Sequence, residues 1–114
     1  IHYKVYIARD EEGRYILEKR GNSGLLANMW QFPMIEIKKG EDTLQKLAEQ
    51  YVVEVKKEHG TVQQFKHVFS HLTWHIEVQL VEVQSNNEEI FFAPEQIEHL
   101  PMPVPMLKIW NEIK

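Results

Sequence analysis

The clearest pattern along the chain is an alternation of apolar and polar residues over positions 72–80. Leu72, Trp74 and Ile76 are apolar, and the residues between them are polar. An alternation with a period of two is typical of a strand with one buried face. We expect residues 62–68 to pair with this strand as a hairpin. The sequence therefore places Phe69-Ser70-His71 at or near the connection between two strands.

Shorter patterns predict the first part of the chain. Residues 3–8 and 15–17 are rich in apolar side chains and are separated by a polar turn closed by Gly13, so we expect a hairpin there. Residues 30–37 look extended, with Pro33 at an edge or an irregular position. A helix is expected after Asp42, which suits the N-cap position and has Gln45 three residues later. Its buried face would comprise Leu44, Leu47, Ala48 and Tyr51.

Patterns in the rest of the chain predict a strand, then a short helix and a final helix. The β-branched run at residues 52–55 returns the chain to a strand. Ala93-Pro94 fits the start of a short helix with proline in the first turn. Pro101, Pro103 and Pro105 are expected to form a stiff connector to a final helix at residues 106–113. Strands, one main helix, further strands and a late helix predict an α+β fold.

Composition limits the classes of protein that fit. A chain of 114 residues with 43% hydrophobic and 26% charged residues suits one globular domain. It has no apolar run near the roughly 20 residues of a membrane span. The absence of cysteine excludes disulfides and thiolate metal sites. A net charge of −4 argues against an autonomous, tight nucleic-acid binder, although a neighbouring domain could supply phosphate contacts. The chain begins without Met on a strand-like segment, so we expect a piece of a longer protein.

Residues 65–75 contain three histidines, which could suggest a metal site, but the spacing of these histidines argues against one. His67, His71 and His75 are four residues apart, and four strand residues span about 13 Å. Zinc ligands each lie about 2 Å from the metal, so His71 and His75 of a strand cannot share one ion. Ser70 and His71 are neighbours that point to opposite faces of an extended chain. A metal site and a serine–histidine nucleophile are therefore not expected.

Two interpretations of the same stretch remain open from the residues alone. Phe69 and Trp74 can be core residues, with Ser70 in a turn and the histidines solvated. For His67, Trp74 and His75 this interpretation is favoured. Phe69-Ser70-His71 can instead form a recognition tip, because loops on rigid scaffolds often carry function.

Two longer stretches resemble a known family. Residues 24–33 read GLLANMWQFP, residues 67–75 read HVFSHLTWH, and residues 100–104 close the pattern with LPMPV. In order and separation they resemble the C-terminal domain of the bacterial MutY adenine DNA glycosylases. The resemblance spans nearly the whole chain. It implies a Nudix-like α/β/α sandwich with a mixed sheet, one main helix and a C-terminal helix, with residues 1–114 forming a single domain.

The resemblance also implies a function in base excision repair. The family removes adenine mispaired with 8-oxoguanine, using carboxylates and an iron–sulfur cluster of an N-terminal domain. We therefore expect no catalytic residue, metal or cofactor within this chain, and a glycosidase as its parent. The implied partner is double-stranded DNA with 8-oxoguanine:adenine mispairs, bound together with the N-terminal domain. A cytoplasmic bacterial monomer at the nucleoid, with no membrane contact, is expected.

By the same resemblance, Phe69, Ser70 and His71 would form the lesion-reading loop, with Leu72 and Lys66 in support. Guanine presents N7 as an acceptor in the major groove. In 8-oxoguanine that nitrogen carries a hydrogen, which a serine hydroxyl can accept. Ser70 is thus the candidate reader, Phe69 a wedge or a support, and His71 a positioning residue.

Two alternatives remain. An active Nudix hydrolase of an oxidised nucleotide such as 8-oxo-dGTP needs a glycine pair and a helix of carboxylates that holds divalent cations. Met34-Ile35 stands where the glycine pair should follow Pro33. Residues 49–54 read EQYVVE, which leaves Glu54 as the one carboxylate near the expected place. We therefore expect the fold without the hydrolase chemistry. A protein-interaction module without a role at nucleic acid is the other alternative.

Overall fold

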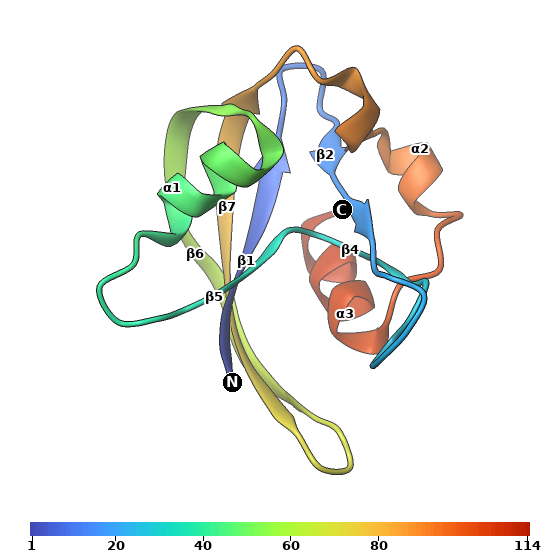
Figure 1. The fold of residues 1–114 in the computed structure, drawn as a ribbon. Helices are drawn as coiled ribbons and strands as arrows, with labels where there is room; N and C mark the ends of the chain where they lie inside the picture. Colours follow the sequence, from blue (N-terminus) through green and yellow to red (C-terminus); the bar gives the residue numbers. More distant parts are fainter.

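The computed structural model describes residues 1–114 as a mixed six-stranded sheet with helices on both faces (Figure 1). The main strand order is β6-β7-β1-β2-β8, and β5 also pairs with β1. β1 and β7 are parallel, whereas the other pairs are antiparallel. A separate two-stranded sheet joins β3 to β4. The α+β class and the mixed sheet expected from the sequence are confirmed.

The elements have the following bounds. The strands are β1 (His2–Arg9), β2 (Tyr15–Ile16), β3 (Glu18–Lys19), β4 (Trp30–Gln31), β5 (Met34–Glu36), β6 (Glu54–Val68), β7 (Thr73–Gln84) and β8 (Phe91–Phe92). The helices are α1 (Thr43–Tyr51), α2 (Pro94–Ile97) and α3 (Val104–Ile113), with a 3-10 turn at Glu88–Ile90. None of the helices has the length and apolar composition needed to cross a bilayer.

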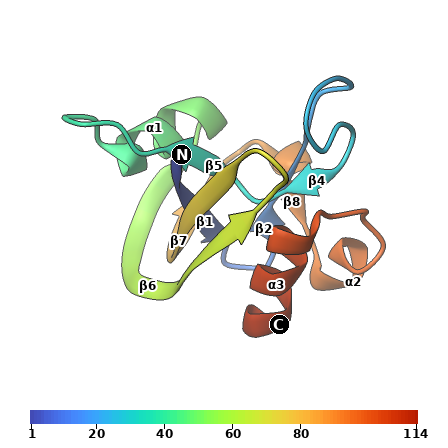
Figure 2. The same ribbon diagram turned by 90° about the horizontal axis from the view of Figure 1, so that it is seen from below.

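Two hydrophobic cores lie on opposite faces of the sheet. Because successive strand residues point to opposite faces, β1 and β7 contribute to both cores. The core on the α3 side includes Val5, Ile7, Trp74, Ile76, Val78, Met106, Ile109 and Trp110. The core on the α1 side includes Tyr6, Ala8, Leu47, Tyr51, Val81 and Val83. Figure 2 shows α1 and α3 on either side of these strands.

Helix α1 begins as the sequence predicts. The Asp42 carboxylate accepts hydrogen bonds from the backbone N–H groups of Leu44, at 3.0 Å, and Gln45, at 3.2 Å. The side chain of Gln45 donates to Glu49 and does not reach back to the N-cap, so the capping box suggested by the sequence does not form. The helix ends at Val52, which adopts the left-handed conformation with φ 56°. The N-cap and the apolar face are confirmed.

Three expected boundaries are wrong. The hairpin partner expected at residues 62–68 is part of one longer strand, β6, that begins at Glu54. α3 begins at Val104 and not at residue 106, so Pro105 lies in its first turn and not in a connector. Proline fits there because the first N–H groups of a helix have no partner within the helix. β7 continues beyond residue 80 to Gln84, because Val81 and Val83 are buried against the α1 side. Pro33 falls between β4 and β5, as expected of an irregular position.

Candidate functional site

The β6–β7 hairpin projects beyond the rest of the sheet at the bottom of Figure 1. Its register runs from Glu54 opposite Gln84 to Val68 opposite Thr73. The backbone N–H of Phe69 donates to the carbonyl of Leu72 at 2.6 Å, which closes the turn. Ser70 and His71 are the two residues at its end, and we call this pair the hairpin tip. The expected position of residues 69–71 at the connection is confirmed.

The hairpin tip is open to a partner. Both side chains are exposed. No hydrogen bond within the chain engages the Ser70 hydroxyl or the backbone N–H groups of Ser70 and His71. Neither residue has a positive φ, so the turn does not require glycine. The tip therefore presents one hydroxyl and two N–H donors to solvent.

Phe69 supports the tip from inside the hairpin. Its ring is partly buried against the α3-side core. The ring centroid lies 4.8 Å from that of Trp74 and 4.7 Å from that of His67, and both contacts are edge-to-face. Leu72 packs against the same core. Of the two roles considered for Phe69, this position favours support over insertion as a wedge. Trp74 is a core residue as expected, whereas His67 is partly buried and not fully solvated.

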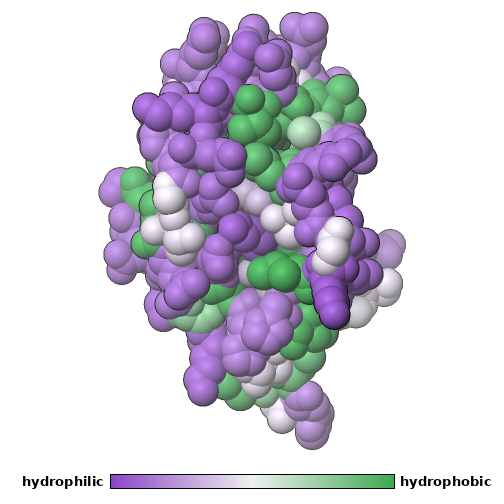
Figure 3. All heavy atoms as spheres, turned by 90° about the vertical axis from the view of Figure 1, so that its left-hand side faces the viewer, coloured by the Kyte–Doolittle hydropathy of each residue, from purple (hydrophilic) through white to green (hydrophobic).

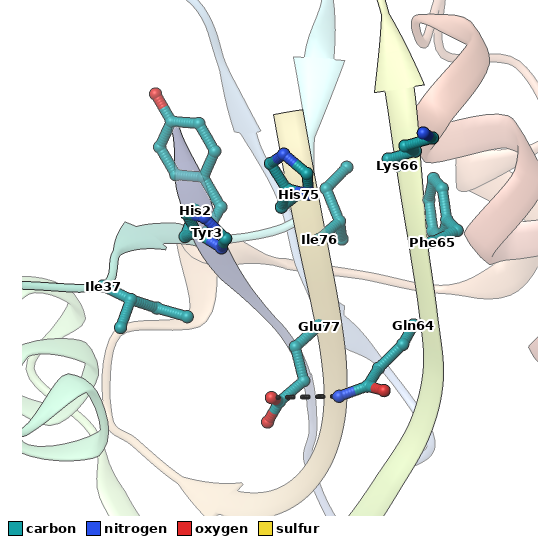
Figure 4. Close-up of a pocket in the computed structure, with 9 residues that line it drawn as sticks. All are labelled: His2, Tyr3, Ile37, Gln64, Phe65, Lys66, His75, Ile76 and Glu77. Carbon is teal, nitrogen blue, oxygen red and sulfur yellow. Dashed lines mark hydrogen bonds between the residues drawn. The ribbon is translucent and has the colours of Figure 1, made fainter. Parts of the chain in front are cut away.

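Lys66 and His75 lie on the opposite face of the hairpin, across from each other. His75 stacks on His2 of β1, with ring centroids 4.4 Å apart. Desolvation, followed by the charge of His2, lowers the pKa of His75. All three residues line an open pocket of about 390 Å³ (Figure 4). Sequence patterns missed His2, because the parallel β1–β7 pairing joins segments that are far apart in the chain.

The acidic helix of a metal-dependent hydrolase has no counterpart in α1. Glu54 opens β6 with an exposed side chain and pairs with Lys56 at 3.0 Å. Glu49 accepts a hydrogen bond from Gln45. Met34-Ile35, in place of a glycine pair, is part of β5. No three His, Asp or Glu side chains gather in a way that could hold a metal ion. These residues do not fit the oxygen-rich shell that Mg²⁺ requires.

Known proteins share both the sequence pattern and the fold. The family model of a NUDIX domain matches residues 4–112. An adenine DNA glycosylase of Arabidopsis thaliana is 32% identical over 95 residues, covering 69% of this chain and 15% of that protein. The chain thus corresponds to a small part of that relative's length.

Solved structures with this fold include both hydrolases and a glycosylase domain. RenU, a Nudix hydrolase from M. smegmatis, has a TM-score of 0.65 and 12% identity, with 98% of this chain and 83% of that chain covered. The C-terminal domain of mouse MUTYH, solved in complex with human PCNA, has a TM-score of 0.64 and 15% identity, with 96% and 84% covered. At these identities the likeness concerns the fold alone. Together with the family match and the curated relative, it shows that the chain belongs to the NUDIX domain family and is a MutY-like member of it.

Proposed function

We propose that this domain reads 8-oxoguanine opposite adenine in duplex DNA, as the recognition part of a base excision repair glycosylase. The observation that carries the proposal is the exposed Ser70 hydroxyl, without an internal partner, at the end of a projecting hairpin. The similarity to an adenine DNA glycosylase supports the choice of lesion. The catalytic carboxylates and an iron–sulfur cluster would belong to a separate N-terminal domain.

The hydrogen-bonding groups of the hairpin tip match the oxidised base. Guanine offers an acceptor at N7, whereas 8-oxoguanine carries a hydrogen there and a carbonyl at C8. The Ser70 hydroxyl accepts the N7 hydrogen, and the free N–H groups of Ser70 and His71 donate to the new carbonyl. A well-made base contact discriminates by about 1–3 kcal/mol, which is about tenfold to a hundredfold.

Recognition by a tip of two residues requires that the tip be held in place. The ring of Phe69 fixes the turn from the core side, and the tight bond from its N–H to Leu72 closes it. His71 positions the loop against base or phosphate. A tip restrained by these contacts loses less conformational entropy on binding than an unrestrained loop, so more of the contact energy is available for discrimination.

The charge of the chain sets the strength of binding. Because the net charge is −4, the domain alone neutralises few phosphates and binds DNA weakly at physiological salt. The N-terminal domain supplies most of the affinity, and this domain supplies the preference for the lesion.

Amide chemical shifts of the 15N-labelled domain test the proposal at low salt. We expect a duplex with an 8-oxoguanine:adenine pair to change the amide chemical shifts of residues 69–72 more than a matched guanine:adenine duplex does. Ser70→Ala should remove that difference, while Lys57→Gln, at the distant end of β6, should not. Lesion reading would be contradicted if both duplexes gave equal chemical-shift changes. It would also be contradicted if none of residues 69–72 showed a change. Mg²⁺-dependent release of pyrophosphate from 8-oxo-dGTP would instead support a hydrolase.

A further inference from the structure

One face of the hairpin base carries an ordered array of polar side chains on the α1 side of the sheet. The register aligns residues across β1, β7 and β6 in three rows. The rows are His2, His75 and Lys66, then Lys4, Glu77 and Gln64, then Tyr6, Gln79 and Thr61. Helix α1 covers the sheet from the third row onwards, where the Tyr6 hydroxyl hydrogen-bonds Thr43 at 2.7 Å. The first two rows remain uncovered by the helix.

The second row is neutral because its charges are paired. The Lys4 ammonium lies 2.6 Å from the Glu77 carboxylate. The carboxylate also accepts hydrogen bonds from Gln64, at 3.4 Å, and from Thr61, at 3.3 Å. Glu77 is thereby fully engaged, and its pKa is lowered first by the hydrogen bond from Lys4. It is not free to neutralise the first row.

The first row has no carboxylate partner. We call His2, His75 and Lys66 the cationic row. No ion pair engages any of the three side chains, and all three are exposed. The groups that face His75 are His2 from β1, Lys66 from β6, and Glu77 farther along its own strand. Its surroundings are thus cationic except for a carboxylate held by Lys4.

The cationic row forms one side of the open pocket in Figure 4. The pocket of about 390 Å³ is within the range that accepts small ligands or ligand groups. Ile37 lines it from the segment that follows β5. Lys38 and Lys39 follow directly, are exposed and form no ion pair. Figure 3, which views the α1 side, shows a largely hydrophilic surface broken by smaller apolar patches. Apart from Glu77, which Lys4 engages, the side chains of the pocket's lining that can carry a charge near neutral pH are those of the cationic row.

We infer that the cationic row binds a backbone phosphate of the duplex whose damaged base the hairpin tip reads. This inference rests on the proposed function. Lys66 precedes Ser70 by four residues, which is about 13 Å along a strand. The major groove of DNA is about 12 Å wide, which is close to this distance. When the hairpin tip contacts a base edge in the groove, Lys66 therefore lies near the sugar–phosphate backbone at the edge of the groove. A phosphate accepts charge-assisted hydrogen bonds from an ammonium and an imidazolium.

Binding of a phosphate should be coupled to protonation of His75. The His75 ring stacks on His2, and desolvation, followed by the charge of His2, already lowers the pKa of His75. A bound phosphate would offset these effects and favour the charged form of the His75 imidazole. Affinity for the duplex therefore falls as pH rises through the lowered pKa of His75 and towards the ordinary imidazole range.

The test measures duplex affinity of the domain by NMR titration at low salt, with lesion and undamaged duplexes in parallel. Lys66→Gln combined with His75→Gln should weaken binding to both duplexes by a similar factor, about threefold to tenfold, and reduce the salt dependence. The ratio of the two affinities should stay unchanged. Lys57→Gln is the matched control, because Lys57 is exposed on the same strand but far from the row. The single His75→Gln variant should lose most of the pH dependence.

The outcomes separate this inference from the proposed function. If the double variant binds as tightly as Lys57→Gln while Ser70→Ala still abolishes the lesion preference, the phosphate site is refuted and lesion reading stands. If the double variant weakens binding but Ser70→Ala leaves the preference intact, the phosphate site stands and lesion reading fails. Inorganic phosphate or a mononucleotide that shifts His2 and His75 as strongly as the duplex does would overturn the assignment to the DNA backbone. No shift with any duplex would overturn both.

Discussion

Replacing Phe69 with alanine removes the ring that supports the hairpin tip. The ring is partly buried and makes edge-to-face contacts with Trp74, at 4.8 Å, and His67, at 4.7 Å. Full burial of a phenylalanine side chain contributes about 1.5–3 kcal/mol. An aromatic pair adds about 0.5–1.5 kcal/mol. Because the ring is only partly buried, we take half of the burial contribution and add one aromatic pair. Phe69→Ala should therefore lower the free energy of unfolding by about 2 kcal/mol.

Urea unfolding followed by tryptophan fluorescence measures this loss. Phe69→Leu keeps an apolar contact but no ring edge, so we expect it to cost about half as much as Phe69→Ala. Ser70→Ala is the control, because that side chain is exposed and should change the free energy of unfolding by less than about 0.5 kcal/mol. If Phe69→Ala were as stable as Ser70→Ala, the ring would not anchor the turn, and its role as a wedge would have to be reconsidered.

Three further outcomes follow from particular contacts. Asp42→Ala removes the N-cap of α1 and should lower the free energy of unfolding by about 1 kcal/mol, as measured in urea; no change would contradict the cap assignment. Lys4 lowers the pKa of Glu77, so its contribution is present above the ordinary glutamate pKa and is lost as pH falls through the lowered value. The stability advantage of the native chain over Glu77→Gln should therefore shrink in acid, and a pH-independent difference would contradict the pairing. Incubation with 8-oxo-dGTP and Mg²⁺ should release no pyrophosphate, and turnover abolished by Glu54→Gln would refute our reading of the degenerate helix.

Local pattern was sufficient to predict the hairpin and its connection. The alternation at residues 72–80 reflects a strand whose α3 side is buried, which Trp74 and Ile76 confirm. The alternation ends where α1 covers the other face as well, so Val81 is buried although the pattern assigns its position to the polar side. Burial on both faces is a property of the assembled layers, which a pattern along one strand does not contain.

Long-range pairing explains what the sequence did not predict. The cationic row forms only because β1 lies parallel to β7. These two strands are far apart in the sequence, and no turn or short connection between them indicates that they pair. The support of the tip by Phe69 likewise depends on how the hairpin bends towards the α3-side core. The resemblance located Phe69, Ser70 and His71 as candidates, and the structure shows which of these side chains are accessible. The expectation of a fold without hydrolase chemistry came from the residue types alone, because apolar side chains such as Val53 stand where carboxylates would be needed.

Single-turnover kinetics of the proposed parent, an adenine DNA glycosylase that contains this domain, would test lesion reading most directly. Rates of adenine removal opposite 8-oxoguanine and opposite guanine should be compared for the native protein and Ser70→Ala. Loss of the hydroxyl should lower the ratio of the two rates about tenfold or more, with the rate opposite guanine nearly unchanged. A variant that retains the native ratio would show that the hydroxyl at the hairpin tip does not read the oxidised base.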